Sequence, residues 1–499
     1  MPENAIRPRR PFFHGLNVFC KALVLLSGGA VLLFISLLTV KNLLPELQGG
    51  DVLIYLSALA AIVLICWLIL RGTSGGWGFF ALVVAVAVAL RLGYILSVPS
   101  QPDSDFAVLL GAARQSAAGD FSWATEVYFY NWAYQIPFVL YEGLILKLFN
   151  SVFALKMLNL AFMVGNCVLV YAIALPAGKR AALCAMLLYA LYPDAVQMSS
   201  VLTNQHIATF FMLLSIALLC RGKYAAAFLS GVSLGISNLM RPEAVLIIIA
   251  AACMVIWTAA ESAESGKWKK TLFSFLLLCA AYILVTKGAE LILRAVNVAP
   301  NGLGNRVPEW KFALGLNFSS GGGYSDEYSY ILTIKDGAQR WAETKEMIAA
   351  TFAACESPLS FFANKCYVMW AQTVGEAWSN TGVDVGAPLA SGAFTVGQLQ
   401  HTLNVTNAAL YPLIWLCALC SVPFLKKDRD DVKVFRFALI ILLGFFLVFL
   451  LVEVQGRYRY CIVPLAAVLT APIFSRLSGQ RAQHREKTVK KVQNQENNA

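Results

Sequence analysis

The chain has 499 residues, of which 59% are hydrophobic and only 13% are charged, and its mean hydropathy is +0.66. Soluble domains carry roughly a quarter of their residues as charged side chains, so this composition excludes a soluble globular protein. The net charge of +11 need not indicate a nucleic-acid partner, because the basic residues gather in the tails and at the ends of apolar runs. We therefore expect an all-α polytopic membrane protein.

Apolar runs of spanning length recur along the whole chain and predict a bundle of about twelve transmembrane helices. Residues 134–150 are also apolar enough to insert, but counting them as a span would invert every later loop. We interpret them as a juxtamembrane or re-entrant helix. The twelve runs are 20–44, 52–71, 77–98, 153–175, 181–200, 204–220, 225–241, 243–261, 271–294, 405–424, 433–452 and 459–477.

The charge of the loops predicts the orientation of this bundle. With twelve spans, every basic turn falls on the cytoplasmic side, as the positive-inside rule requires, and Asp103 and Asp105 fall on the outer side. The agreement of loop charge with span count supports both predictions. The basic segments are the N-terminus 1–10, the turns at 71–76, 178–180, 221–223, 267–270 and 426–430, and the tail from 476 to 491.

Two long segments are predicted on the outer face, and they divide the chain into parts. Region 99–150 is rich in aromatic residues, which favour the level of the lipid headgroups, so we expect amphipathic helices on the membrane surface. Region 296–403 is too long for an ordinary connection and is therefore expected to be functional. The parts are a tail with two extra helices (1–76), a membrane module (77–295), the exterior region (296–403), the last helices (404–477) and a basic tail (478–499).

Four polar clusters stand at the predicted outer ends of the helices. Charges within membrane spans are costly and usually mark function or pairing, so four clusters on one face predict a polar cavity that opens to the outside. Each cluster also has a purely structural interpretation, such as a turn at the aspartates, snorkelling of Arg241 or an interfacial belt at 457–460. The clusters are Asp103 and Asp105 with Arg91 deeper in the helix, Asp194 with Thr203–His206, Arg241–Glu243, and Glu453–Tyr460.

Soluble cofactors are not indicated by the sequence. It contains no Walker motif, no dinucleotide-binding glycine fingerprint and no Ser-His-Asp constellation. The four histidines are scattered along the chain, so a histidine-based metal site is not expected. We expect no cofactor to be required, although two aspartates alone do not decide whether a divalent metal takes part.

In this order, the clusters resemble the GT-C superfamily of membrane glycosyltransferases, and most closely the branch of protein O-mannosyltransferases and the lipid A aminoarabinose transferase (family 39-like). The likeness extends from about Arg91 to Pro464, and no single motif in it is specific. Gln205 stands where many relatives carry glutamate, and two apolar spans precede the helix that ends near Asp103. The matching segments are Pro102–Phe106, Leu191–Ala195, Ser200–Gln205, Gly231–Gly235 with Arg241–Pro242, and Glu453–Tyr458 with Pro464.

This resemblance implies transfer of a sugar from a polyprenyl-phosphate donor to a glycan, lipid or protein acceptor of the cell envelope, with inversion at the anomeric carbon. It also implies that 77–295 is the catalytic membrane module and that 296–403 binds the acceptor or forms a lid. Asp105, and after it Asp103, would be the general base that takes the acceptor proton. Arginine binds phosphate oxygens bidentately, so the donor phosphate would be held by Arg241 and Arg457, with Arg91 a further choice. The residues expected to bind substrate are Tyr458, Glu453, Asp194, Gln205 and Tyr128.

Other functions share this substrate class. A flippase or transporter of lipid-linked glycans would use the same cavity without needing the aspartates as a base, and would tend to show paired halves with broken helices. A polymerase or ligase of lipid-linked glycans and a structural membrane scaffold are further alternatives. The absence of an organellar retention signal in the basic C-terminal tail favours a bacterial plasma membrane, with the active site on its outer face.

Overall fold

The computed structural model describes residues 11–44, 47–72, 76–262, 266–390 and 392–479. These residues form helices joined by turns, and no strand occurs among them apart from two isolated bridges. Nine of the described helical segments are long and apolar enough to cross a bilayer, and a bent helix pair makes a tenth if it is counted as one span. The prediction of an all-α polytopic membrane protein is therefore confirmed.

The nine long apolar segments coincide with nine of the runs predicted from hydropathy. Their outward faces carry exposed apolar side chains, such as Leu53 on α2 and Leu284 on α13, as expected of helices that face lipid. They are α1 (Pro11–Leu43), α2 (Asp51–Arg71), α3 (Trp77–Ser97), α7 (Val152–Ala174) with η3 (Leu175–Ala177), α12 (Ala244–Ser262), α13 (Lys267–Ala295), α18 (Val396–Ser421) with η6 (Val422–Lys426), α19 (Lys433–Leu451) with η7 (Asp430–Val432), and the segment 456–479 with η8 (Gly456–Cys461) and α20 (Val463–Leu469).

The other three predicted runs are helical as well, but they are shorter or bent. Run 181–200 is α8 (Lys179–Ala190) followed, after a 56° bend, by α9 (Pro193–Gln197) and η4 (Met198–Ser200). Pro193 explains the break, since proline cannot continue a helix that precedes it. The remaining two are α10 (Gln205–Leu219) and α11 (Tyr224–Met240). A count of twelve spans is reached when the bent pair and these two helices are each included.

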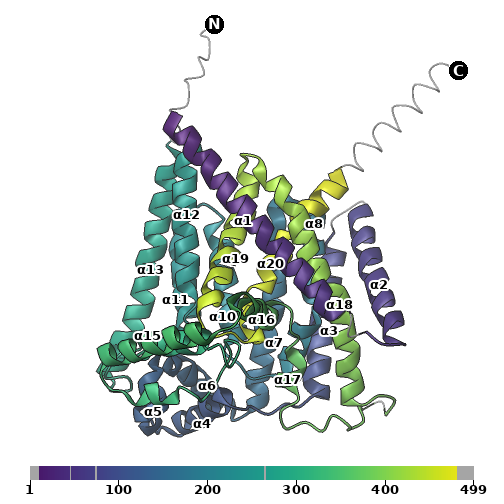
Figure 1. Ribbon diagram of the computed structural model, residues 1–499. Helices are drawn as coiled ribbons and strands as arrows, with labels where there is room; N and C mark the ends of the chain where they lie inside the picture. The colour runs from purple at the N-terminus through teal and green to yellow at the C-terminus, as the bar shows by residue number, and fades with distance from the viewer. Residues whose placement is uncertain (1–10, 45–46, 73–75, 263–265, 391, 480–499) are drawn as a thin grey trace, which may run out of the picture.

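The first predicted outer region consists of short helices. Its main elements are α4 (Asp105–Ala118), α5 (Val127–Asn131) and α6 (Ile136–Phe149), with the 3-10 turns η1 (Ser122–Thr125) and η2 (Ala133–Gln135) between them. At 14 residues, α6 is shorter than the roughly 20 residues of a typical span, and the interpretation of 134–150 as a juxtamembrane or re-entrant helix stays a prediction. In Figure 1 this region lies at the lower end of the bundle, opposite the beginning of α1.

The second predicted outer region folds at the same end of the bundle (Figure 1). Two of its helices begin with side-chain caps, from Asp336 and Ser357. A small apolar cluster that includes Trp310, Leu314 and Ile331 holds it together. Its elements are α14 (Glu309–Gly315), η5 (Ser329–Thr333), α15 (Gly337–Ala354), α16 (Pro358–Trp370) and α17 (Gly375–Ser379).

Ion pairs and hydrogen bonds join several of the basic turns to one another. Arg180 donates to the carbonyl of Leu70 at 3.4 Å, and Lys21 pairs with Asp428 at 2.6 Å. Arg436 bridges the same turn to the end of α12. Some of the turns that loop charge assigns to the cytoplasm therefore lie close to one another. Residues 1–10 and most of the tail 478–499, which carry further basic charge, lie outside the described residues.

Two glycines let α11 pack closely on α13. A Cβ atom at Gly231 would lie 2.2 Å from the carbonyl oxygen of Leu278, and one at Gly235 would lie 2.7 Å from Cβ of Val285. Small residues four apart allow helix backbones to approach in this way within a membrane. The contact fixes the C-terminal end of α11, and Arg241 follows directly after that end.

Candidate functional site

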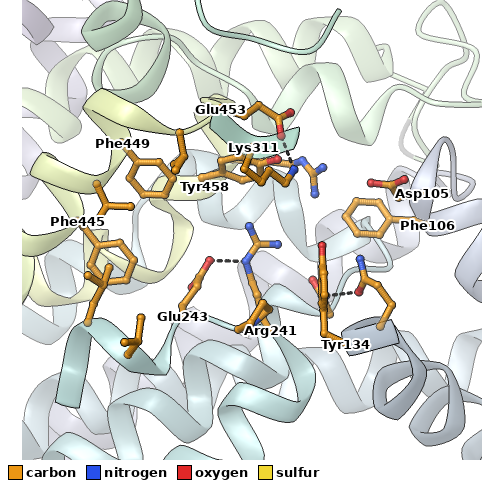
Figure 2. Close-up of a pocket in the computed structure, with 18 residues that line it drawn as sticks. Asp105, Phe106, Tyr134, Arg241, Glu243, Lys311, Phe445, Phe449, Glu453 and Tyr458 are labelled. Atoms are coloured by element: carbon orange, nitrogen blue, oxygen red, sulfur yellow. Dashed lines mark hydrogen bonds and ion pairs between the residues drawn. The ribbon is translucent and has the colours of Figure 1, made fainter. Parts of the chain in front are cut away.

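A cavity of about 240 Å³ lies at the end of the bundle that carries the two long outer regions. Segments far apart in the sequence build it: the start of α4, the η2 turn, the junction of α11 and α12, α14, and the connection from α19 to η8 (Figure 2). One part of its wall is polar and the other is apolar. The polar side chains are Asp105, Tyr134, Gln135, Asn204, Arg241, Glu243, Lys311, Glu453, Arg457 and Tyr458.

Asp105 is the first residue of α4 and stands at the exposed rim of the cavity. The preceding residue, Ser104, has a φ of +52°, a left-handed conformation that is strained for a residue with a side chain. Burial raises the pKa of Tyr128, and the nearby carboxylate of Asp105 raises it further. Tyr128 therefore lies beside Asp105 as a neutral phenol, just outside the cavity lining.

Arg241 extends from the end of α11 into the middle of the cavity (Figure 2). Its guanidinium forms an ion pair with Glu243, and its Cζ lies 5.0 Å from the centre of the Tyr458 ring. The side chains of Arg241 and Glu243 are only 16% and 18% exposed. The pairing and the aromatic contact compensate the burial of this cation.

Lys311, from α14, forms a second ion pair with Glu453 across the cavity. The Glu453 side chain is 1% exposed and also accepts a hydrogen bond from Gln455 at 2.7 Å. Burial opposes the ionisation of Glu453, but the charge and the hydrogen bond of Lys311 outweigh it and lower the pKa of this carboxyl group. Both partners are therefore charged at neutral pH.

Arg457 is held mainly by aromatic rings and not by a carboxylate. Its Cζ lies 4.5 Å from the ring centre of Trp378, 4.9 Å from Phe106 and 5.3 Å from Tyr458. Its Nε donates to Gln455 at 2.7 Å, and within the described part of the chain it forms no ion pair. Such a cation, 6% exposed and directed into a cavity, is available to an anionic ligand.

The apolar wall of the cavity comes from α12 and α19, two segments of membrane-spanning length. Figure 2 shows Phe445 and Phe449 on this side, away from Asp105. The cavity thus joins a carboxylate at its rim, cations in its middle and a lipid-like surface at its far side. The apolar lining residues are Phe106, Pro242, Val245, Leu246, Phe445, Val448, Phe449 and Val452.

Two of the four predicted clusters, Arg241–Glu243 and Glu453–Tyr460, supply three lining residues each, whereas the first contributes only Asp105 and the second only Asn204. Of the predicted site residues, Asp105, Arg241, Arg457, Tyr458 and Glu453 line the cavity. Asp103 is exposed next to it and is not part of its lining.

The other predicted residues support the frame of the bundle. Arg91 donates to the carbonyls of Ala190 at 2.9 Å and Tyr189 at 3.4 Å, which satisfies acceptors at the break between α8 and α9. Gln205 donates to the backbone carbonyl of Arg457 at 2.6 Å. Asp194 pairs with Arg459 in the interior at 3.1 Å.

Sequence reasoning did not select Lys311, Tyr134 or Glu243 as site residues. Glu243 stood within a recognised cluster and could have been found as the partner of Arg241. Lys311 and Tyr134 lie in the two long outer regions, where the sequence carries no span pattern that would place them. Among the described residues, no group of three or more His, Cys, Asp or Glu side chains is arranged to hold a metal ion.

No family model and no curated protein matches this chain. Solved structures of an archaeal oligosaccharyltransferase from Archaeoglobus fulgidus do. AglB in complex with an inhibitory peptide and a dolichol-phosphate aligns with a TM-score of 0.47 and 15% identity over 82% of this chain and 51% of that one. The apo form gives a TM-score of 0.40 and 12% identity over 82% and 52% of the two chains, and the form tethered to an acceptor peptide gives 0.41 and 14% over 81% and 50%.

This chain therefore spans about half the length of the solved structures that it matches. At these TM-scores, the case for a function rests on this chain's own residues.

Proposed function

We propose that this chain is a membrane glycosyltransferase of the GT-C type, which transfers a sugar from a polyprenyl-phosphate donor to an acceptor of the cell envelope. The observation that carries the proposal is a cavity in which three cations, of which Arg457 is buried and Arg241 and Lys311 are partly exposed, lie between an exposed carboxylate and an apolar wall of two helices. A polyprenyl-phosphate sugar has the same three parts in the same order: an apolar tail, an anionic phosphate and a sugar. The proposed location is a bacterial plasma membrane, with the cavity on its outer face.

The charges in the cavity favour a phosphate. Arg241 and Lys311 are paired with Glu243 and Glu453, whereas Arg457 forms no ion pair among the described residues and the third carboxylate of the lining, Asp105, stands at the exposed rim. The remaining positive charge lies in a site where arginine can bind phosphate oxygens through two parallel hydrogen bonds. The donor phosphate would therefore be held between Arg241 and Arg457, with the lipid tail along Phe445 and Phe449.

The reaction that fits this arrangement is a direct displacement. An acceptor hydroxyl attacks the anomeric carbon, the bond from that carbon to the phosphate oxygen breaks, and the phosphate leaves with the electron pair. Asp105 takes the hydroxyl proton as general base. Arg241, Lys311 and Arg457 stabilise the negative charge that the leaving phosphate gains. Attack from the side opposite the phosphate inverts the configuration of the sugar, and the scheme requires no cofactor.

The test is sugar transfer by the purified protein in nanodiscs, with radiolabelled polyprenyl-phosphate sugars and an extract of envelope acceptors. We expect Asp105→Asn to lower transfer at least about a hundredfold, because general-base catalysis typically contributes that much, while donor binding is retained. Asp120→Asn is the matched control, since Asp120 is exposed in the same outer region and only caps a local turn.

Each result has a distinct meaning. Equal transfer by wild type and Asp105→Asn would keep the enzyme class and remove Asp105 as the base. Donor binding without transfer, in the presence of acceptors that other transferases use, would overturn the proposal in favour of a flippase or a polymerase of lipid-linked glycans.

A further inference from the structure

A second cavity, of about 260 Å³, lies beside the first and shares one residue with it. Tyr134 lines both cavities and therefore lies between them. The second cavity is bounded by the end of α11, the outer half of α13, the start of α6 and the turn at Leu303–Gly304. Its position next to the proposed reaction site suggests that its occupant takes part in the same reaction.

The surroundings of the second cavity are those of a helix end that meets lipid. On α13, Ile283 lines the cavity and is 56% exposed, and Leu284 and Leu291 beside it are 64% and 65% exposed. An occupant with a lipid tail could leave that tail in the bilayer along α13 while its headgroup occupies the cavity.

The polar lining of the second cavity suits an anionic headgroup. Lys287 and Glu290 line the cavity and pair at 2.7 Å. Arg294, which lies outside the lining, pairs with the same carboxylate at 2.6 Å, so Lys287 shares its anion with a second cation. The Lys287 side chain is 69% exposed. Within the described part of the chain, the amide of Asn238 and the hydroxyl of Tyr282 form no hydrogen bond, and both residues line the cavity. These groups can therefore bind phosphate oxygens or sugar hydroxyls.

We propose that this second cavity binds the phosphate-bearing headgroup of a lipid-anchored acceptor, which reaches the donor past Tyr134. The inference rests on the proposed function and specifies its acceptor. The donor approaches between α12 and α19, whereas the acceptor approaches beside α13, so two lipid substrates reach the reaction centre from different directions. Their headgroups meet at Tyr134, whose neighbours include Arg241 and Asp105.

The first test measures lipid binding, with phosphatidylglycerol as the anionic probe and phosphatidylcholine as the neutral one. Native mass spectrometry of the full chain from mixed nanodiscs counts the lipids that are retained. We expect wild type to retain more phosphatidylglycerol than phosphatidylcholine. Thr286→Trp, whose larger side chain would fill the cavity, should lower the retention of phosphatidylglycerol at least about tenfold. Leu291→Trp is the matched control, because Leu291 lies on the lipid-facing side of the same helix and outside the cavity lining.

A second variant keeps the test valid if Thr286→Trp does not fold. Lys287→Glu changes an exposed side chain and should also lower retention at least about tenfold, because it reverses a charge that faces the headgroup. Equal retention by Lys287→Glu, Leu291→Trp and wild type would overturn the proposal, as would the absence of any preference for the anionic lipid.

Transfer assays separate this inference from the proposed function. In the nanodisc assay, Lys287→Glu should bind the donor like wild type but transfer less sugar to lipid acceptors. If wild type binds no donor, the proposed function fails, whatever the lipid result. If wild type transfers sugar only to soluble glycans or proteins and Lys287→Glu is equally active, the proposed function stands and the lipid-anchored acceptor is wrong.

Discussion

Arg457 and Arg459 are two residues apart in η8, but their side chains lie in different environments. Arg459 is 1% exposed, pairs with Asp194 at 3.1 Å and donates to the carbonyls of Met369 at 3.1 Å and Gln372 at 2.5 Å. Arg457 points into the cavity among aromatic rings, with Gln455 as its polar partner. A buried cation that pairs with a carboxylate and donates to backbone carbonyls supports the fold, whereas a cation without a carboxylate partner at a cavity is available to a ligand.

Removing the interior arginine should have the largest effect, and it acts on stability. Arg459→Met leaves the buried carboxylate of Asp194 without its cation, although the backbone amides of Val374 and Gly375 still donate to it. We expect a loss of about 3–5 kcal/mol in the free energy of unfolding, measured by thermal unfolding in detergent. The double variant Arg459→Met/Asp194→Asn should recover part of this loss. An Arg459→Met protein with an unchanged melting temperature would contradict the structural role.

The cavity arginine should show the reverse pattern. Arg457→Met preserves much of the contact with Trp378 and Phe106 but removes the charge. We expect a melting temperature close to that of wild type and about a hundredfold loss of sugar transfer, because one stabilising donor at a developing charge contributes on that order. Transfer rates and thermal unfolding of the same preparations check both parts. If Arg457→Met unfolds as easily as Arg459→Met, the comparison between the two positions fails.

The sequence alone predicted much of the fold. Hydropathy located all twelve helical runs, because apolar length is imposed directly by the thickness of the bilayer. The basic turns and the apolar pattern also placed Asp105, Arg241 and Glu453 at the same end of the bundle. The structure adds that they line one cavity.

What the sequence could not predict is which charges face the cavity. Asp194 and Arg91 stand in or near spans, as Arg241 does, and the high cost of a buried charge marks all three alike. Only the tertiary contacts show that Asp194 pairs with Arg459 and that Arg91 satisfies the carbonyls at the α8–α9 break. Lys311 comes from a region without a span pattern, so nothing in the sequence connected it with Glu453.

Lys365 is a buried lysine that, among the described residues, neither pairs with a carboxylate nor lines the two cavities described above. On α16, it donates to the carbonyls of Gly315 and of Leu450, the latter at 3.0 Å. Burial lowers the pKa of Lys365 to about 7. Between that value and the ordinary lysine pKa, the unfolded chain binds more protons than the folded one, so stability should rise with pH over this range.

We expect this lysine to contribute up to about 1 kcal/mol per pH unit between pH 7 and 10. Lys365→Met should flatten that rise in a series of thermal unfolding experiments. The matched control is Lys345→Met on α15, an exposed lysine of the same exterior region. An equal slope in wild type and Lys365→Met would show that the lysine stays protonated in the fold.

The smallest effect should come from a second pair of like residues two positions apart, Asp103 and Asp105. Both are exposed, but only Asp105 lines the cavity, and the left-handed backbone at Ser104 lies between them. Exposed charges outside a site are screened by salt, so Asp103→Asn should change sugar transfer less than about threefold at physiological ionic strength. The same assay on Asp105→Asn supplies the reference. A large loss with Asp103→Asn would mean that the base is shared between the two carboxylates, because position in the cavity is the difference that separates them.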